Sequence, residues 1–447
     1  LEFRRVLFRS QGQTEAAIGA YRVAVQTLQT LRQDLVTNTA DVQFSFRDSV
    51  EPVYRELTDL LLQTTDRLPP AEQQARLREA REAIEDLQLA ELDNFFREAC
   101  LDGQPRTIDA IDPHAAVIYP ILLQNSIEVI VSLPNGSLRH HRAVMSNSDR
   151  DTAFNRLRQY TNPVFTTDRL LPSSAEVYNW LLRPLESTLA QQQIQTLVFV
   201  LDGSLRSIPM SLLYDGQQFL VEKYNLAIAP GLRLLHPAVP LAADRRRFNT
   251  LSILLGGLSQ AHNGFESLPN VQREVEGVAA LIPSHTVLLN DQFTEHRVVQ
   301  ELKEDPTAIV HFATHGQFSS RADQTFLLTW QGEMNVKTLD QLLQERLTQD
   351  PIDLLVLSAC QTAQGDDRAA LGLAGMAVRS GARSTLGTLW AINDRSTAQL
   401  ILDFYQNLTQ GQGKAQALRQ AQLALLHSAD YAHPYYWAPF VLIGQWR

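Results

Sequence analysis

The sequence contains few cysteines and few lysines, and each shortage excludes a class of protein. Two cysteines among 447 residues, Cys100 and Cys360, cannot make a disulfide framework, and no CxxC motif or Cys/His cluster suggests a metal site. Lysine occurs only at Lys223, Lys303, Lys337 and Lys414, and the net charge is −10. This charge balance argues against direct binding to nucleic acid or to a membrane surface. We expect a reducing, cytoplasmic setting with no metal and no cofactor.

Long apolar runs are also missing. No run approaches the ~18 residues that a membrane-spanning helix needs, and no signal sequence opens the chain. The first ten residues, LEFRRVLFRS, lack an initiator Met and differ in composition from the rest of the chain. We interpret residues 1–10 as a non-native scar and expect the native N-terminus to be missing. The remaining residues have a soluble composition and are numerous enough for two or three domains.

Residues 11–108 carry the periodicity of helices. Apolar residues recur at three- and four-residue steps in residues 14–36, 49–68 and 71–100, with Ser49 as the expected cap of the second helix. A self-contained bundle is one interpretation. The stretch EAAIGAYRVAV, however, has the Ala and Tyr placement of a tetratricopeptide repeat, so we interpret residues 11–108 as the end of such an array. Cys100, at the end of the third helix, is expected to be a buried structural thiol.

The pattern changes to strands after residue 108. The stretch AAVIYPILLQNSIEVIVSLPNGSLRHHRAV predicts a three-stranded meander, and two helical stretches complete a region over residues 109–191. In residues 192–447 short apolar runs alternate with helical patterns, as in QTLVFVLDG, NLAIAP, LSILLGG, HTVLLND, AIVHFATHG, DLLVLSAC and STLGTLW. Apolar strands separated by helices predict an α/β fold with a largely parallel sheet flanked by helices.

Two of these runs end in residues that could carry chemistry. One ends at His315-Gly316 and another at Cys360. If the strands are neighbours, these residues emerge at the same edge of the sheet. An imidazole beside a thiol would accept its proton and stabilise the thiolate, and the N–H groups of Gly316 and Cys360 would form an oxyanion hole. The alternatives are a buried thiol at Cys360 and, for His311, a side chain packed within the sheet.

The motifs HFATHG, LSACQTA, GARSTLGTLWAIND and HPYYWAPFVLIG together resemble the CHAT domain, a caspase-like module often fused to tetratricopeptide repeats in bacteria. The resemblance runs from about residue 192 to the C-terminus. It implies a clan of cysteine peptidases that includes caspases, legumain, gingipains and separase, with His-Gly after one strand and Ala-Cys after a later one. Carried over, Cys360 is the nucleophile and His315 the base of an endopeptidase controlled by a sensor module and acting on a partner protein.

The resemblance also implies cleavage after a basic residue, which would need an acid in the specificity pocket. The candidates at strand ends are Asp202 and Asp394, and Asp366 and Asp367 are third choices on the loop after Cys360. Two other functions use the same fold: a non-catalytic interaction or signalling module, and a thioesterase or amidohydrolase acting on small molecules. A serine hydrolase is disfavoured because GGLSQA lacks the last glycine of GxSxG and is followed by a loop, HNGFESLPN. The oligomeric state stays open.

Overall fold

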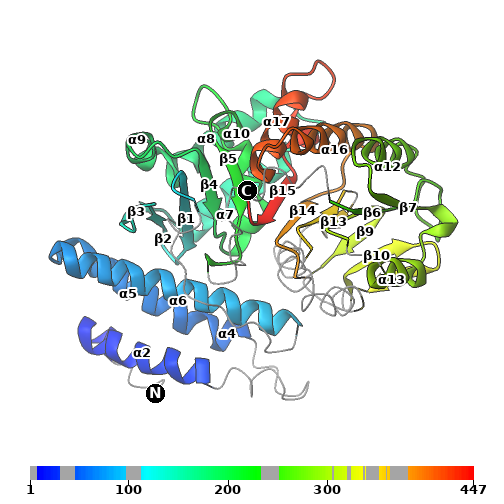
Figure 1. The fold of residues 1–447 in the computed structure, drawn as a ribbon. Coiled ribbons are helices and arrows are strands. Elements are labelled where there is room, and N and C mark those ends of the chain that lie inside the picture. Colours follow the sequence, from blue (N-terminus) through cyan, green and yellow to red (C-terminus); the bar gives the residue numbers. More distant parts are fainter. Residues whose placement is uncertain are drawn as a thin grey trace.

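The computed structural model describes residues 8–30, 46–96, 112–232, 251–304, 307–319, 324–335, 338, 352–358, 360–362 and 381–447, with backbone only at residues 47, 95, 96 and 360–362. Helices at the N-terminus lie beneath one end of a long sheet, and further helices cover its faces (Figure 1). The α/β fold with a large, mostly parallel sheet flanked by helices is therefore confirmed.

The main sheet has eleven strands in the order β3-β2-β1-β4-β5-β15-β14-β12-β8-β6-β7. Its strands are β1 (Ala115–Leu122), β2 (Ser126–Ser132), β3 (Leu138–Val144), β4 (Thr196–Phe199), β5 (Asn225–Ile228), β6 (Ile253–Gly257), β7 (His285–Leu289), β8 (Ile309–Ala313), β12 (Leu354–Leu357), β14 (Ser384–Thr388) and β15 (Phe440–Gly444). The predicted meander is β1–β3, and β1 pairs in parallel with β4. The meander thus extends the same sheet.

The sheet consists of two halves that run in opposite directions. Strands β1, β4, β5 and β15 are parallel to one another. Strands β14, β12, β8, β6 and β7 are also mutually parallel. Because β14 pairs antiparallel with β15, the carboxyl ends of the two sets of parallel strands lie at opposite edges of the sheet.

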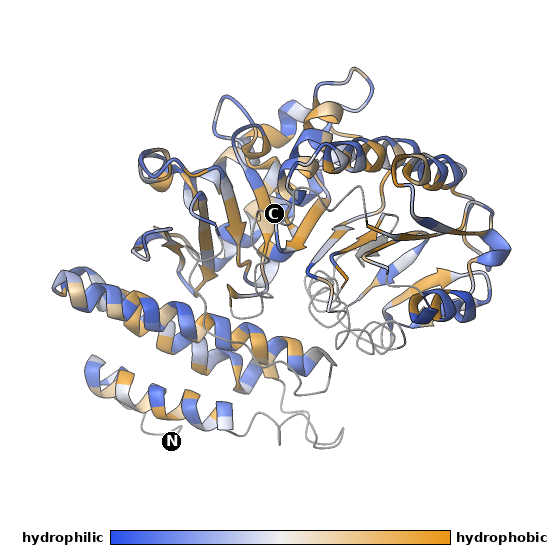
Figure 2. Cartoon of the chain, in the orientation of Figure 1, coloured by the Kyte–Doolittle hydropathy of each residue, from blue (hydrophilic) through white to orange (hydrophobic). Residues whose placement is uncertain are grey.

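Helices bury the apolar residues of both faces. The covering helices are α7 (Asn147–Tyr160), α8 (Thr167–Leu181), α9 (Glu186–Gln191), α10 (Leu220–Lys223), α12 (Asn270–Leu281), α13 (Glu295–Glu304), α16 (Asp394–Thr409), α17 (Lys414–Leu426) and α18 (Pro434–Trp437). Along β8, Ile309 and Ala313 belong to the layer under α12 and α16, whereas Val310 and Phe312 belong to the opposite layer with α13. A strand covered on both faces therefore has a continuous apolar sequence, and Figure 2 shows most strands in the middle of the main sheet as apolar.

A second, four-stranded sheet has the order β11-β10-β9-β13. Its strands are β9 (Gly316–Phe318), β10 (Phe326–Thr329), β11 (Gly332–Asn335) and β13 (Cys360–Thr362). The sequence did not predict this sheet, because segments of three or four residues carry too little periodicity to be recognised. It begins where β8 and β12 end.

The N-terminal helices are α2 (Thr14–Thr30), α4 (Phe46–Ser49), α5 (Glu51–Thr64) and α6 (Pro70–Phe96). The expected cap at Ser49 is wrong: Ser49 ends α4, and Val50 precedes α5 without a side-chain hydrogen bond. Polar side chains attach α6 to the sheet domain, since Tyr119 Oη donates to Glu85 at 2.6 Å and Gln88 donates to the Leu201 carbonyl at 3.1 Å. The helical layer is therefore joined to the sheet domain by specific buried contacts.

Candidate active site

The backbone of Cys360 lies beside that of the His315-Gly316 pair. Strands β8 and β12 are parallel neighbours, with Phe312 opposite Leu357. Beyond them β9 and β13 are also parallel, and the Cα of Cys360 is in register with the Cα of Gly316. Adjacent strands are about 4.8 Å apart. The two strands are therefore neighbours, which was the condition for His315 and Cys360 to emerge at one edge of the sheet.

The imidazole of His315 is held in a defined orientation. Its Nε2 lies 2.8 Å from the carbonyl oxygen of Glu266, and its ring lies 5.1 Å from that of Phe265, centroid to centroid. A carbonyl oxygen only accepts, so Nε2 carries the proton in this hydrogen bond and Nδ1 of the neutral ring keeps its lone pair. The partly exposed ring therefore presents Nδ1 as the nitrogen that can accept a proton.

The loop that contacts His315 follows β6, the strand next to β8. Its start is held by Asn290, whose Oδ1 accepts from the N–H groups of Ser259 and Gln260 at 2.9 and 3.2 Å. In its middle the ring of His262 stacks on that of Trp330, with centroids 4.2 Å apart. From the sequence alone, this loop served only as evidence against a serine hydrolase. Its place after a strand of the same half-sheet was the signal that could have marked it as part of the site.

Asp394 lies at the same edge of the sheet, six residues after the end of β14. It begins α16, and its Oδ2 accepts from both the backbone N–H and the side-chain Nδ2 of Asn270, each at 2.8 Å. Asn270 begins α12, so the carboxylate also accepts a hydrogen bond from a backbone N–H group that has no partner within the helix. Within the described part of the chain, no hydrogen bond to Oδ1 of Asp394 is found.

The expectation that Asp202 binds a basic substrate side chain is corrected by the structure. Asp202 follows β4, which belongs to the half-sheet of opposite direction, so it lies at the other edge and about 24 Å across the sheet from His315. Its carboxylate is buried and bound by Arg55 Nη1 and Nη2 at 2.6 and 2.8 Å and by Leu122 N at 2.8 Å. Burial raises its pKa, but the Arg55 charge and hydrogen bonds outweigh burial and hold the pKa below its usual value.

His311 is packed within the sheet, as predicted. It is fully buried, its Nε2 lies 2.9 Å from Glu274 Oε1, and its ring stacks on Tyr405 with centroids 5.6 Å apart. Ser358 Oγ lies 3.5 Å from the same nitrogen. His311 therefore contacts helices α12 and α16, which cover one face of the sheet, and does not belong to the edge where His315 and Cys360 lie. Cys100, Asp366 and Asp367 lie outside the described residues.

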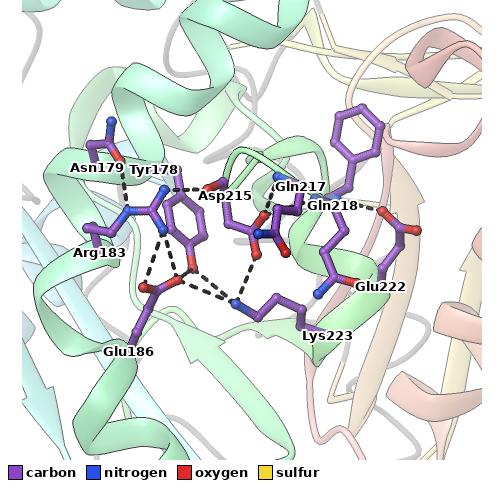
Figure 3. Close-up of polar contacts among 10 residues, drawn as sticks. Tyr178, Asn179, Arg183, Glu186, Asp215, Gln217, Gln218, Glu222 and Lys223 are labelled. Carbon is purple, nitrogen blue, oxygen red and sulfur yellow. Dashed lines mark hydrogen bonds and ion pairs between the residues drawn. The ribbon is translucent and has the colours of Figure 1, made fainter.

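A second polar cluster lies on the other half of the molecule (Figure 3). Lys223 Nζ lies 3.0 Å from Asp215 Oδ2 and 3.4 Å from Glu186 Oε1, and Tyr178 Oη donates to Glu186 at 2.6 Å. Burial lowers the pKa of Lys223, but the two carboxylates raise it above its usual value overall. A lysine nucleophile needs a lowered pKa, so this cluster stabilises the fold rather than providing a reactive amine.

The described residues offer no obvious place for a metal ion, because no three His, Cys, Asp or Glu side chains among them gather closely enough to hold one. Among the described helices, none has both the length and the hydropathy needed to cross a bilayer.

The structure is thus an α/β protein in which His315-Gly316 and Cys360 follow neighbouring parallel strands. The chain belongs to the CHAT domain family, whose model matches residues 171–445. Among curated proteins it is similar to tetratricopeptide repeat protein 28 of Mus musculus (25% identical over 333 residues) and of Homo sapiens (23% over 327). Each alignment covers 61% of this chain and 13% of the relative, so the chain spans about an eighth of those proteins.

Two solved structures are similar to this chain at low sequence identity. One is the separase–securin complex of Saccharomyces cerevisiae, with a TM-score of 0.49 and 10% identity, covering 95% of this chain and 37% of that chain. The other is the complex of the pro- and mature domains of RgpB from Porphyromonas gingivalis, with a TM-score of 0.39 and 7% identity, covering 67% and 77%.

Proposed function

We propose that this chain is a regulated, cytoplasmic cysteine endopeptidase that cuts a partner protein after a basic residue. The observation that carries the proposal is the register of Cys360 with Gly316 at the edge where the His315 imidazole is oriented by Glu266. Cys360 is the nucleophile and His315 the base. Asp394 is the acid that receives the basic side chain before the cut, because it shares this edge and has one carboxylate oxygen without a described hydrogen bond.

In the proposed reaction the Cys360 thiol gives its proton to Nδ1 of His315, and the thiolate sulfur attacks the carbonyl carbon of the peptide bond. The N–H groups of Gly316 and Cys360 stabilise the negative oxygen that forms. The C–N bond then breaks, and the leaving amine takes the proton from the imidazolium. Water, deprotonated by His315, hydrolyses the thioester and frees Cys360. The Nε2–H bond to Glu266 favours this path, since it fixes the tautomer in which Nδ1 is basic.

The helical region supports regulation by a bound protein. We propose that residues 11–108 are the end of a tetratricopeptide array and that a protein bound upstream controls the site. The name of the mouse and human relatives, which refers to such repeats, supports this interpretation, as does the stacking of α2 on α5 and of α5 on α6.

The test is covalent labelling with an acyloxymethyl ketone probe that carries Arg, followed by mass measurement of the modified peptide. Wild-type protein is expected to be labelled at Cys360, and His315→Ala and Cys360→Ala are expected to lose labelling at that position. His427→Ala is the matched control, because His427 is 67% exposed and lies on the C-terminal side of α17. Equal labelling of wild type and His315→Ala would contradict the assigned base, and absence of labelling in wild type would favour a non-catalytic interaction module.

A further inference from the structure

One short segment connects the candidate base with the candidate specificity acid. At one end Glu266 accepts the Nε2–H of His315 at 2.8 Å. Four residues later Asn270 donates two hydrogen bonds to Asp394 Oδ2. His315 and Asp394 are 79 positions apart in the sequence. The segment Phe265–Asn270 is thus a structural link between two groups that serve different steps of the proposed reaction.

The segment has little freedom to move independently at either end. Phe265 lies between the rings of His315 and Phe326, at centroid distances of 5.1 and 6.3 Å. Pro269 precedes α12 with φ at −62°, and the buried Val271 and Val275 fix the helix against the sheet. A proline ring restricts its own φ, and packed side chains resist sliding. The stretch between the Asp394 carboxylate and the Glu266 carbonyl is therefore short and restrained at both ends.

The two oxygens of Asp394 allow it to bind both partners at once. Oδ2 accepts from Asn270, and no described hydrogen bond engages Oδ1. A carboxylate has about four lone-pair sites and can bind a guanidinium while still accepting from an amide. A basic side chain on Oδ1 would leave the Asn270 bonds in place and draw the carboxylate into one fixed orientation.

We propose that Asn270 is a positioning residue that couples the specificity acid to the base, so that a basic substrate side chain bound at Asp394 orders His315 through the Phe265–Asn270 segment. This inference rests on the proposed function. Its consequence is that an arginine before the cut accelerates the reaction of Cys360 as well as tightening binding, because binding energy at Asp394 orients the imidazole.

The experiment compares Asn270→Ala and Asn270→Asp with wild type in the full chain. Asn270→Asp keeps the shape and suits the start of a helix, but replaces the donor by a second negative charge. Two quantities are measured by mass at Cys360. The first is the ratio of the labelling rate with an Arg probe to the labelling rate with an uncharged citrulline probe. The second is the pH dependence of alkylation by iodoacetamide, a reagent without a side chain that could bind the specificity pocket. Gln272→Ala is the control, since Gln272 is exposed on α12 and bonds Glu276.

Loss of one charge-assisted hydrogen bond is expected to lower the Arg-to-citrulline ratio about tenfold in Asn270→Ala, and further in Asn270→Asp. The iodoacetamide profile is expected to move to higher pH in both variants, because a less ordered imidazole stabilises the thiolate less. Gln272→Ala is expected to match wild type in both readouts, and thermal unfolding confirms that each variant is folded.

Four results would overturn the inference. A changed ratio with an unchanged pH profile would show that Asn270 acts on Asp394 alone, and two unchanged readouts would show that it acts on neither. An Asp394→Asn variant that keeps the wild-type ratio would remove Asp394 as the specificity acid while leaving the Cys360–His315 pair intact. Labelling that fails in wild type contradicts the proposed function itself, and this inference with it.

Discussion

Arg55 of α5 binds both carboxylate oxygens of Asp202, which lies three residues after β4 in the sheet domain. The Asp202 side chain is 2% exposed and that of Arg55 18%, so the pair is largely removed from water. A second pair, Arg206 with Glu91 of α6, joins the same two parts of the molecule. Two largely buried ion pairs therefore hold the helical region on the sheet domain.

Replacement of Arg55 by alanine is expected to destabilise the protein by about 3 kcal/mol, because it leaves the Asp202 charge buried without its partner. The double variant Arg55→Met/Asp202→Leu is expected to recover part of that loss, because neither charge then remains but the buried N–H of Leu122 loses its acceptor. Urea unfolding followed by circular dichroism measures both. Equal stability of Arg55→Ala and wild type would contradict a structural role for the pair.

The same carboxylate predicts how stability depends on pH. The folded-state pKa of Asp202 lies below the usual 3.8, so its stabilisation is fully present above the unfolded pKa and is lost as the pH falls through the folded pKa. Wild type is therefore expected to lose stability more steeply than Asp202→Asn below about pH 4. Above about pH 5 the difference between the two should be constant. Parallel curves in acid, measured by thermal unfolding at stepped pH, would show that Arg55 does not stabilise the ionised carboxylate.

Glu274 is expected to matter for stability and not for catalysis. Glu274→Ala removes the hydrogen-bond partner of the buried His311 and is expected to cost about 2 kcal/mol. Glu274→Gln keeps an acceptor oxygen and is expected to cost less than half of that, with unchanged probe labelling at Cys360. Thermal unfolding and labelling are measured on the same samples. A selective loss of labelling in a stable Glu274→Gln variant would place this buried pair in the reaction after all.

Gly444 and Gly332 form a matched pair for testing the packing of β15. Both have positive φ, 98° and 134°, but a Cβ on Gly444 would collide with the backbone oxygen of Arg383, whereas one on Gly332 meets nothing within 4 Å. Gly332→Ala is expected to cost about 1 kcal/mol from backbone strain alone. Gly444→Ala is expected to cost about 3 kcal/mol more or to prevent folding. Similar melting temperatures for the two variants would contradict the close packing of Gly444 against the backbone oxygen of Arg383.

Phe265 provides a prediction on activity. Phe265→Ala removes the ring against His315 and is expected to slow labelling by the Arg probe about tenfold, because the imidazole becomes less ordered. Gln272→Ala, which is exposed on α12 beyond the Phe265–Asn270 segment, is the control and is expected to match wild type. Rates of labelling at Cys360 are compared after thermal unfolding has shown both variants to be folded. A rate for Phe265→Ala equal to the control would exclude an orienting role for the ring.

The sequence allowed most of the parallel strands of the main sheet and their carboxyl ends to be predicted, because these strands are continuous apolar runs. His315 and Cys360 follow such runs directly, and their strands are neighbours with no other strand between them. The end of a strand can be recognised from neighbouring residues in the sequence. The positions of His315 and Cys360 after their strands could therefore be predicted.

The direction of each half-sheet could not be predicted in this way. It depends on which strands β15 joins, and that choice involves residues more than 200 positions apart, such as Ile443 opposite Ile228. Asp202 therefore looked like a strand-end acid at the same edge as Cys360. The contact of Asn270 with Asp394, 124 positions apart, was missed for the same reason, since no local pattern encodes a side chain meeting a distant helix terminus.

Strand β15 lies in the middle of the main sheet, between β5 and β14, although it is the last strand in chain order. During synthesis the two half-sheets therefore remain unjoined at their shared boundary until β15 has left the ribosome. A truncation before Phe440 would separate them, and the loss of Trp446 and Arg447 would also remove the bonds that both residues make to Asp112, at 2.8 Å each, just before β1. Protein whose translation is interrupted before β15 would thus lack a continuous sheet.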